Sequence, residues 1–306
     1  MTAQTPSVAT SDVGAAAMPA AAPATPLAAL AAAGFVLFAA TLPIGLAPMT
    51  IAGVLCVTLA IVAALAGVTD ARRMLWARTP VAVPALAWIA ATLIATALAA
   101  DPRASAASLG RGALPLVAGF AAAQASDRAR GGRAIVALLA AGSMAALIGV
   151  ARFVAAGARF PSRAIGLSGS WMTFGVAMML LASVAAAIAL TARDRAWRLG
   201  ASCAAFAALV ALAASFTRAA WIGAALALAI VFALARPRWL IALAALIVLV
   251  FAAPGDFGAR LRSAIDPAHP LNREREMMWQ AGRRILAEHP WFGVGLVNLQ
   301  PWIEPY

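Results

Sequence analysis

The hydrophobic positions of this chain gather into long apolar runs separated by short polar loops. A helix needs about 20 predominantly apolar residues to cross about 30 Å of hydrocarbon. The runs of this kind lie at 27–46, 49–68, 80–99, 107–125, 134–155, 172–191, 199–216, 219–235 and 239–253. The pattern predicts an all-α polytopic membrane protein with nine transmembrane helices.

The stretch 201–235 is apolar throughout except for Ser215, Thr217 and Arg218. One straight helix of this length would measure about 52 Å, far more than a bilayer needs. We therefore expect two helices that fold back on each other at Ser215–Arg218.

The composition excludes other classes of protein. The chain is 64% hydrophobic and 11% charged, whereas soluble domains are about 45–50% apolar and about 25% charged. A soluble enzyme and a disordered chain are both excluded. The net charge is +12, and all 23 basic residues are arginine. In a soluble protein such a positive charge would suggest binding to nucleic acid. Here the arginines lie mostly in short loops between apolar runs. We therefore expect them to contact membrane lipid, and we expect no nucleic-acid partner.

The arginines also predict the topology. More of them follow the even-numbered apolar runs than the odd-numbered ones, and loops rich in arginine remain in the cytoplasm. We expect residues 1–26 to be a disordered cytoplasmic tail, 27–253 a transmembrane helical domain, and 254–306 part of a periplasmic loop.

The outer segment contains a predicted amphipathic helix at 273–288, with Asn272 as N-cap and Pro290 as its stop. Such a helix would rest on a membrane surface or roof a cavity. We expect Glu274, Glu276 and Glu288 to pair with arginines of the same helix.

Three outer arginines are candidates for chemistry. They are Arg163 before the sixth run, Arg218 at the hairpin tip, and Arg275, four residues before Trp279 on one helical face. Guanidinium groups bind phosphate oxygens in pairs and stay protonated. Converging guanidinium groups would suit a lipid-linked pyrophosphate and would stabilise it as a leaving group. The alternative is that these arginines only contact lipid headgroups.

The sequence indicates no cofactor. Gly293 and Gly295 lack the third glycine of a dinucleotide site. His269 and His289 both adjoin proline, without an orienting carboxylate nearby. No Cys/His cluster is present, so we expect neither metal nor nucleotide.

Four stretches resemble the O-antigen ligase and polymerase family of polytopic bacterial inner-membrane proteins, over roughly 27–306. They are Arg163–x–x–Gly before a spanning helix, the Thr/Ser–Arg–Gly/Ala–x–Trp hairpin around Arg218, the Arg275–x₃–Trp279 pair, and the His–Pro–x–x–Gly–x–Gly–x–x–Asn run from His289 to Asn298.

The resemblance implies a metal-independent glycosyltransferase. Such proteins take glycan from undecaprenyl pyrophosphate at the periplasmic face and pass it to a lipid A–core sugar, a growing chain or a protein. By resemblance, Arg163 and Arg218 hold the pyrophosphate, Arg275 assists, and the amphipathic helix roofs the cavity.

The chain departs from the family pattern at its end. Relatives continue with a histidine-containing segment and further spanning helices, whereas this sequence ends at Tyr306. His289 matches a different motif from that histidine, so we expect a truncated protein that lacks the base. The alternatives to a ligase are a membrane transporter, which usually shows polar or broken spans, and a non-catalytic membrane protein.

Overall fold

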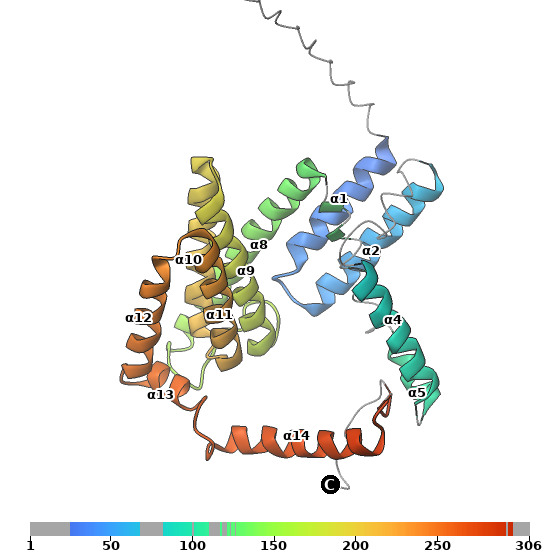
Figure 1. Cartoon of the computed structure of the whole chain (residues 1–306). Helices are drawn as coiled ribbons and strands as arrows, with labels where there is room; N and C mark the ends of the chain where they lie inside the picture. The colour runs from blue at the N-terminus through green and yellow to red at the C-terminus, as the bar shows by residue number, and fades with distance from the viewer. Residues whose placement is uncertain are drawn as a thin grey trace, which may run out of the picture.

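The computed structural model describes residues 25–67, 82–99, 101–109, 117, 121–122, 124–125, 127–291 and 293–295 (Figure 1). All regular elements in these ranges are helices, which confirms the all-α prediction. They are α1 (Pro26–Thr41), α2 (Leu46–Leu65), α4 (Ala82–Ala97), α5 (Pro102–Ala107), α8 (Arg128–Ala155), α9 (Trp171–Thr191), α10 (Arg195–Ala214), α11 (Arg218–Ala235), α12 (Trp239–Ala252), α13 (Asp256–Arg262) and α14 (Pro270–Glu288).

The predicted count of nine spans is not confirmed. In the part of the chain described, five helices are long and apolar enough to cross a membrane: α2, α8, α9, α10 and α11. A sixth is added if α12 and α13, bent by 102°, form one span. Helices α1 and α4 have 16 residues each, or about 24 Å of length. Most of the predicted run 107–125, and all but Thr25 and Pro26 of the predicted tail, lie outside the described residues.

Two helices begin earlier than their apolar runs because an aspartate caps each of them. Asp127 accepts a hydrogen bond from the backbone N–H of Arg130 at 2.9 Å, and Asp194 accepts one from Trp197 at 2.9 Å. Such caps satisfy N–H groups that have no partner within the helix. As a result α8 has 28 residues, about 42 Å, and extends beyond the hydrocarbon.

The predicted hairpin is confirmed as two helices. Helix α10 ends at Ala214 and α11 begins at Arg218, and both pack along α9. The core between α8, α9 and α10 consists largely of alanine, with Phe174 and Met178 fully buried among them. Small residues allow helix backbones to approach closely without a large hydrophobic driving force.

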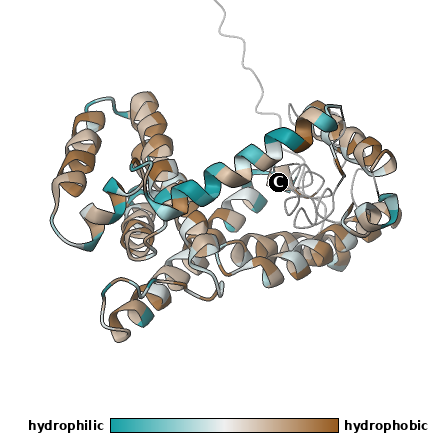
Figure 2. Cartoon of the chain, turned by 90° about the horizontal axis from the view of Figure 1, so that it is seen from below, coloured by the Kyte–Doolittle hydropathy of each residue, from teal (hydrophilic) through white to brown (hydrophobic). Residues whose placement is uncertain are grey.

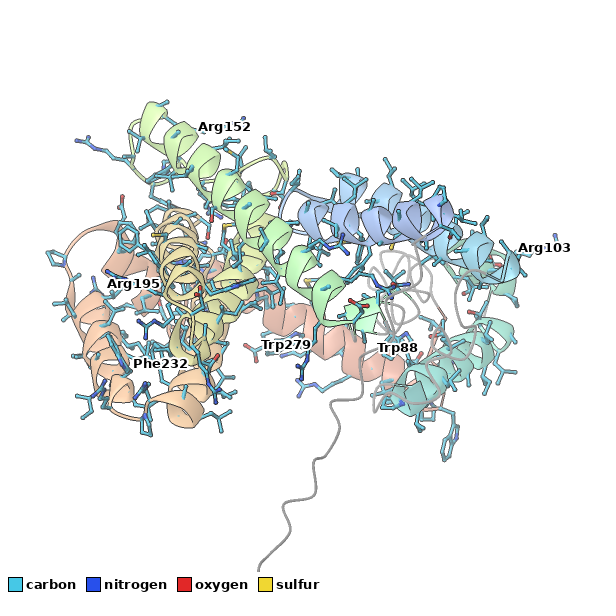
Figure 3. The ribbon with its side chains drawn as sticks, turned by 90° about the horizontal axis from the view of Figure 1, so that it is seen from above. Trp88, Arg103, Arg152, Arg195, Phe232 and Trp279 are labelled. Atoms are coloured by element: carbon cyan, nitrogen blue, oxygen red, sulfur yellow. The ribbon has the colours of Figure 1, made fainter. Side chains whose placement is uncertain are left out.

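Helix α14 lies across one end of the helical bundle, from α13 towards α4 and α5 (Figures 1 and 3). It begins at Pro270, so the prediction of Asn272 as N-cap is wrong. Proline fits the first helical position because its missing N–H would have no partner there. The helix ends at Glu288, in agreement with Pro290 as the stop.

The chain after α14 is held against the end of α4 and against α5. Gly295 has a φ of +92°, and a Cβ there would lie 2.4 Å from both Ala99 Cβ and Ser105 Oγ. Only glycine fits this close approach. The second glycine of the predicted Gly–x–Gly run therefore has a packing role.

Candidate functional site

Three segments that are distant in sequence meet at the end of the bundle that α14 crosses: the loop 156–170, the turn 215–217 and the segment 256–272. The backbone N–H of Ala164 donates to Ala214 O at 2.8 Å. The backbone N–H of Phe160 donates to Asp256 Oδ2 at 3.2 Å. The loop is thereby joined both to the hairpin turn and to α13.

Phe216 holds the three segments together from the tip of the hairpin. Its side chain is 1% exposed, and its ring stacks on Phe257 at 4.7 Å and meets Phe160 edge-on at 5.7 Å. Its backbone φ is +49°, a strained value for a bulky residue. The surrounding aromatic contacts stabilise this conformation and fix the position of Arg218, two residues later.

The Arg–x–x–Gly stretch has a structural explanation in Gly166. This residue has a φ of +53°, and a Cβ on it would lie 2.4 Å from the ring of Phe174. Arg152, at the end of α8, donates from Nη1 to Gly166 O at 2.9 Å. The loop is therefore tightly fixed three residues after Arg163.

Arg218 is the most buried of the three predicted arginines, at 5% exposure. Its Nη1 donates to both the carbonyl oxygen and the hydroxyl of Ser263, and its Nη2 donates to Asn272 Oδ1 at 3.3 Å. Asn272 in turn donates to the carbonyl oxygens of Ser263 and Asp266. Arg218 thus anchors the start of α14 while its charge faces only neutral oxygens.

Arg163 is half-buried between two aromatic rings. Its Cζ lies 4.6 Å from the ring centroid of Trp171 and 5.1 Å from that of Phe160. Burial, and after it the charge of Arg218, lower the pKa of the Arg163 guanidinium below its usual range. Arg163 makes no hydrogen bond with the described residues, so its five N–H donors are available.

A fourth arginine, Arg260 of α13, joins these groups. Its Cζ lies 5.4 Å from the centroid of the Phe160 ring, and its Nε donates to Phe216 O at 3.2 Å. It is within electrostatic range of Arg163 and Arg275, and Arg275 is also within range of Arg218. We call Arg163, Arg218, Arg260 and Arg275 the arginine cluster.

No carboxylate of the described residues forms an ion pair with any member of the arginine cluster. Glu274 and Glu276 form no ion pair with Arg275 of the same helix, and Glu276 accepts a hydrogen bond from Gln280 at 3.4 Å. Like charges brought together and partly removed from water repel each other unless an anion joins them. The cluster therefore has the electrostatics of a site for a polyanion.

A cleft of about 830 Å³ opens beside the arginine cluster. Its walls are one face of α14, Ala219 next to Arg218, and 293–295. The residues of that face are Arg275, Met278, Trp279, Gly282, Ile285 and Leu286. We call it the α14 cleft. In the view from below, α14 crosses in front of the hydrophobic helices and is itself largely hydrophilic (Figure 2). The α14 cleft is therefore lined by the apolar side of an otherwise polar helix.

The fold and the site together define a multi-pass membrane protein with a cationic site at one end of its helices. Residues 203–306 match the O-antigen ligase family model. The match includes α11, α13 and α14 and three members of the arginine cluster, and it confirms the resemblance over this part of the chain. No curated protein and no solved structure matches the chain.

The structure brings the three predicted arginines to the same end of the bundle, and it adds Arg260, Ser263 and Asn272, which the sequence did not indicate as site residues. No local pattern marks Arg260. Its position depends on Phe160, from which it is separated in the chain by α9, α10, α11 and α12. The sequence predicts Asn272 only as a helix cap, and its contact with Arg218 arises only in the folded chain.

Proposed function

We propose that this O-antigen ligase-like membrane protein transfers glycan from an undecaprenyl pyrophosphate carrier to lipid A–core or another acceptor. The reaction would take place at the periplasmic face of the bacterial inner membrane, with the N-terminus in the cytoplasm. Arg163, Arg218 and Arg275 bind the pyrophosphate. The observation that carries the proposal is the arginine cluster itself, because its four charges have no carboxylate partner among the described residues.

The four arginines come from different parts of the fold, so we expect the arginine cluster to bind a ligand with two adjacent phosphates rather than one. Arg163 and Arg260 lie beside the ring of Phe160, whereas Arg218 and Arg275 belong to the beginning of α11 and to α14. Arg163 and Arg275 offer all their N–H donors to a ligand. Arg218 uses part of its guanidinium to hold Ser263 and Asn272 and contributes mainly its charge.

The chemistry needed from these groups is electrostatic. The acceptor hydroxyl attacks the anomeric carbon of the glycan, and its proton passes to solvent water as the new bond forms. The bond from that carbon to the pyrophosphate oxygen breaks, and its electron pair stays on the oxygen. Fixed guanidinium groups stabilise this negative charge without reorganising, and removing one such donor typically costs about a hundredfold to a thousandfold in rate.

Transfer can be tested with the full chain reconstituted in vesicles that contain labelled glycan–pyrophosphate–undecaprenol and lipid A–core. We expect labelled glycan on the acceptor and release of undecaprenyl pyrophosphate. Arg163→Gln and Arg275→Gln should each lower the rate about a hundredfold. Arg159→Gln and Arg273→Gln are matched controls, since both residues are exposed neighbours outside the arginine cluster, and should leave the rate unchanged.

Two results would contradict the proposal. One is transfer that proceeds at the original rate in Arg163→Gln and Arg275→Gln. The other is movement of the labelled lipid between leaflets without any glycan transfer, which would identify a membrane transporter.

A further inference from the structure

The beginning of α14 is held by one charged side chain whose partners are all neutral. Arg218 donates from Nη1 to the carbonyl oxygen and the hydroxyl of Ser263, and from Nη2 to Oδ1 of Asn272 at 3.3 Å. A phosphate offers the same guanidinium group two parallel hydrogen bonds and an opposite charge, which together make a stronger pair. The oxygens that hold Arg218 are therefore partners that a phosphate can displace.

The segment that Arg218 holds is bonded within itself and can leave Arg218 as a unit. Nδ2 of Asn272 donates to Ser263 O at 3.0 Å and to Asp266 O at 2.7 Å, and Ser263 Oγ donates to Arg260 O at 2.7 Å. Asn272 also lines an open cleft of about 540 Å³, so water can reach its Oδ1. Loss of Arg218 therefore leaves Ser263 O bonded and Asn272 Oδ1 hydrated, without the penalty of a buried acceptor that has no partner.

Few other contacts hold this half of α14. Of its residues only Ala281 and Ile285, both in the second half, are buried. The far end is held separately, where Gly295 packs against Ser105 of α5. Segments with few buried contacts open locally at a low cost in free energy. Without the hydrogen bonds from Arg218, the beginning of α14 would therefore move while its end stays in place.

An anion bound by the arginine cluster would lie within reach of Arg218. The charges of Arg260 and Arg275 act on Arg218, and the charge of Arg218 acts on Arg163. A diphosphate placed among these groups neutralises their repulsion and offers Arg218 an ionised acceptor. Arg218 then has a stronger partner than the two neutral residues that hold it in this structure.

We propose that the hydrogen bonds from Arg218 to Ser263 and Asn272 form an autoinhibitory latch, which a diphosphate opens. Arg218, which until then contributes mainly its charge, exchanges these neutral partners for phosphate oxygens, and the beginning of α14 is released. The proposal rests on the proposed function, because the arginine cluster has to hold the diphosphate of the carrier. It adds a form of regulation: α14 stays fastened until the donor binds, so that an acceptor enters second.

Opening of the latch and binding of the diphosphate are coupled in both directions. If a diphosphate has to break the latch, its affinity is lowered by the free energy of that step, and removing the latch beforehand should strengthen binding. A single hydrogen bond to a charged group corresponds to about tenfold or more in an equilibrium constant. A merely structural contact would have the opposite effect, because loosening it would make the site bind more weakly.

The test uses the full chain in detergent with inorganic pyrophosphate as the probe. It measures affinity by calorimetry and hydrogen exchange of the backbone amides at 271–277. Pyrophosphate should make this exchange about tenfold faster in the original protein. Asn272→Ala should exchange fast without pyrophosphate, show no further increase with it, and bind it about tenfold more tightly. Circular dichroism checks that the variant is folded.

Gln280→Ala is the matched control for Asn272→Ala. Gln280 is an exposed side-chain amide of the same helix, and it donates to Glu276 rather than contacting the arginine cluster. Its variant should match the original protein in affinity and in exchange, with and without pyrophosphate. Exchange at 271–277 that stays constant or slows when pyrophosphate binds to the original protein would overturn the latch. So would weaker binding of pyrophosphate by Asn272→Ala.

Failure of the proposed function looks different. If Arg163→Gln and Arg275→Gln still bind inorganic pyrophosphate like the original protein, the arginine cluster does not hold the phosphates. If those variants lose inorganic pyrophosphate while exchange at 271–277 of the original protein does not respond to it, only the latch is wrong.

Discussion

Nη2 of Arg218 lies 3.3 Å from Oδ1 of Asn272, a residue 54 positions further along the chain. Through this contact the first residue of α11 holds the beginning of the amphipathic helix α14. The charged group that would bind the substrate therefore also positions the helix that lines the cleft beside it.

Replacing Asn272 should loosen α14 more than it unfolds the bundle. Asn272→Ala removes one hydrogen bond from a charged donor and two donated to backbone carbonyls, and a bond to a charged group contributes about 1.5–3 kcal/mol. Hydrogen exchange of the backbone amides of α14 should become faster, with little change in α8 to α10. Gln280→Ala is the control, and equal exchange rates in the two variants would show that Asn272 does not anchor the helix.

At position 216, a glycine variant should be more stable than an alanine variant, which reverses the usual order of stability. Phe216→Ala loses the aromatic contacts, which for a buried phenylalanine costs about 3–5 kcal/mol. Phe216→Gly loses them too, but glycine adopts a φ of +49° without the penalty of about 1–2 kcal/mol that a Cβ incurs. Thermal unfolding in detergent should therefore place Phe216→Gly above Phe216→Ala. If alanine is the more stable, the strain at this turn is not real. Phe206→Ala, on the exposed side of α10, is the control.

Gly295→Ala should release the end of α14 from α5. The added methyl group would clash with Ala99 and Ser105 and would occupy a backbone conformation that alanine disfavours. Limited proteolysis after α14 should become faster. Gly200→Ala adds a methyl group within α10 where nothing lies within 4 Å, and it should stabilise the protein by about 0.5–1 kcal/mol. Unchanged cleavage of Gly295→Ala would refute the close packing.

Binding of a polyprenyl pyrophosphate should be independent of pH at neutral to mildly alkaline values. The lowered pKa of Arg163 means that folding disfavours its charged form, and a bound anion favours that form and raises the pKa again. Affinity is thus constant below the lowered pKa and falls as the pH rises through it. Titrations from about pH 7.5 to about pH 9, above the pKa of about 6 of the ligand's terminal phosphate, should give one dissociation constant. A midpoint within that range would indicate that a group other than an arginine controls binding.

The sequence predicted the helices well where they are long and apolar, and less well where polar groups determine the ends of a helix. The hairpin at Ser215–Arg218 followed from length alone. Helix ends depended on caps such as Asp127, which lies outside the apolar run. The predicted nine spans are not confirmed, because the described residues contain five long apolar helices, or six if α12 and α13, bent by 102°, form one span.

The candidate site was predicted in part. The positions of Arg163, Arg218 and Arg275 carried the motif resemblance, and the structure places them at one end of the bundle. Arg260 could not be predicted, because its role arises from Phe160 and Phe216, which approach it only in the folded chain. The packing roles of Gly166 and Gly295 likewise depend on Phe174 and on Ser105.

The most direct test of the account is the thermal unfolding midpoint of the full chain in detergent, measured with and without undecaprenyl pyrophosphate. Mutual repulsion within the arginine cluster predicts that Arg260→Gln raises the midpoint of the ligand-free protein, since it removes one unpaired charge. The lipid should raise the midpoint of the original protein, as any ligand specific for the folded state does, and should raise that of Arg260→Gln by less. A lower ligand-free midpoint for Arg260→Gln, together with an undiminished response to the lipid, would contradict an unneutralised anion site.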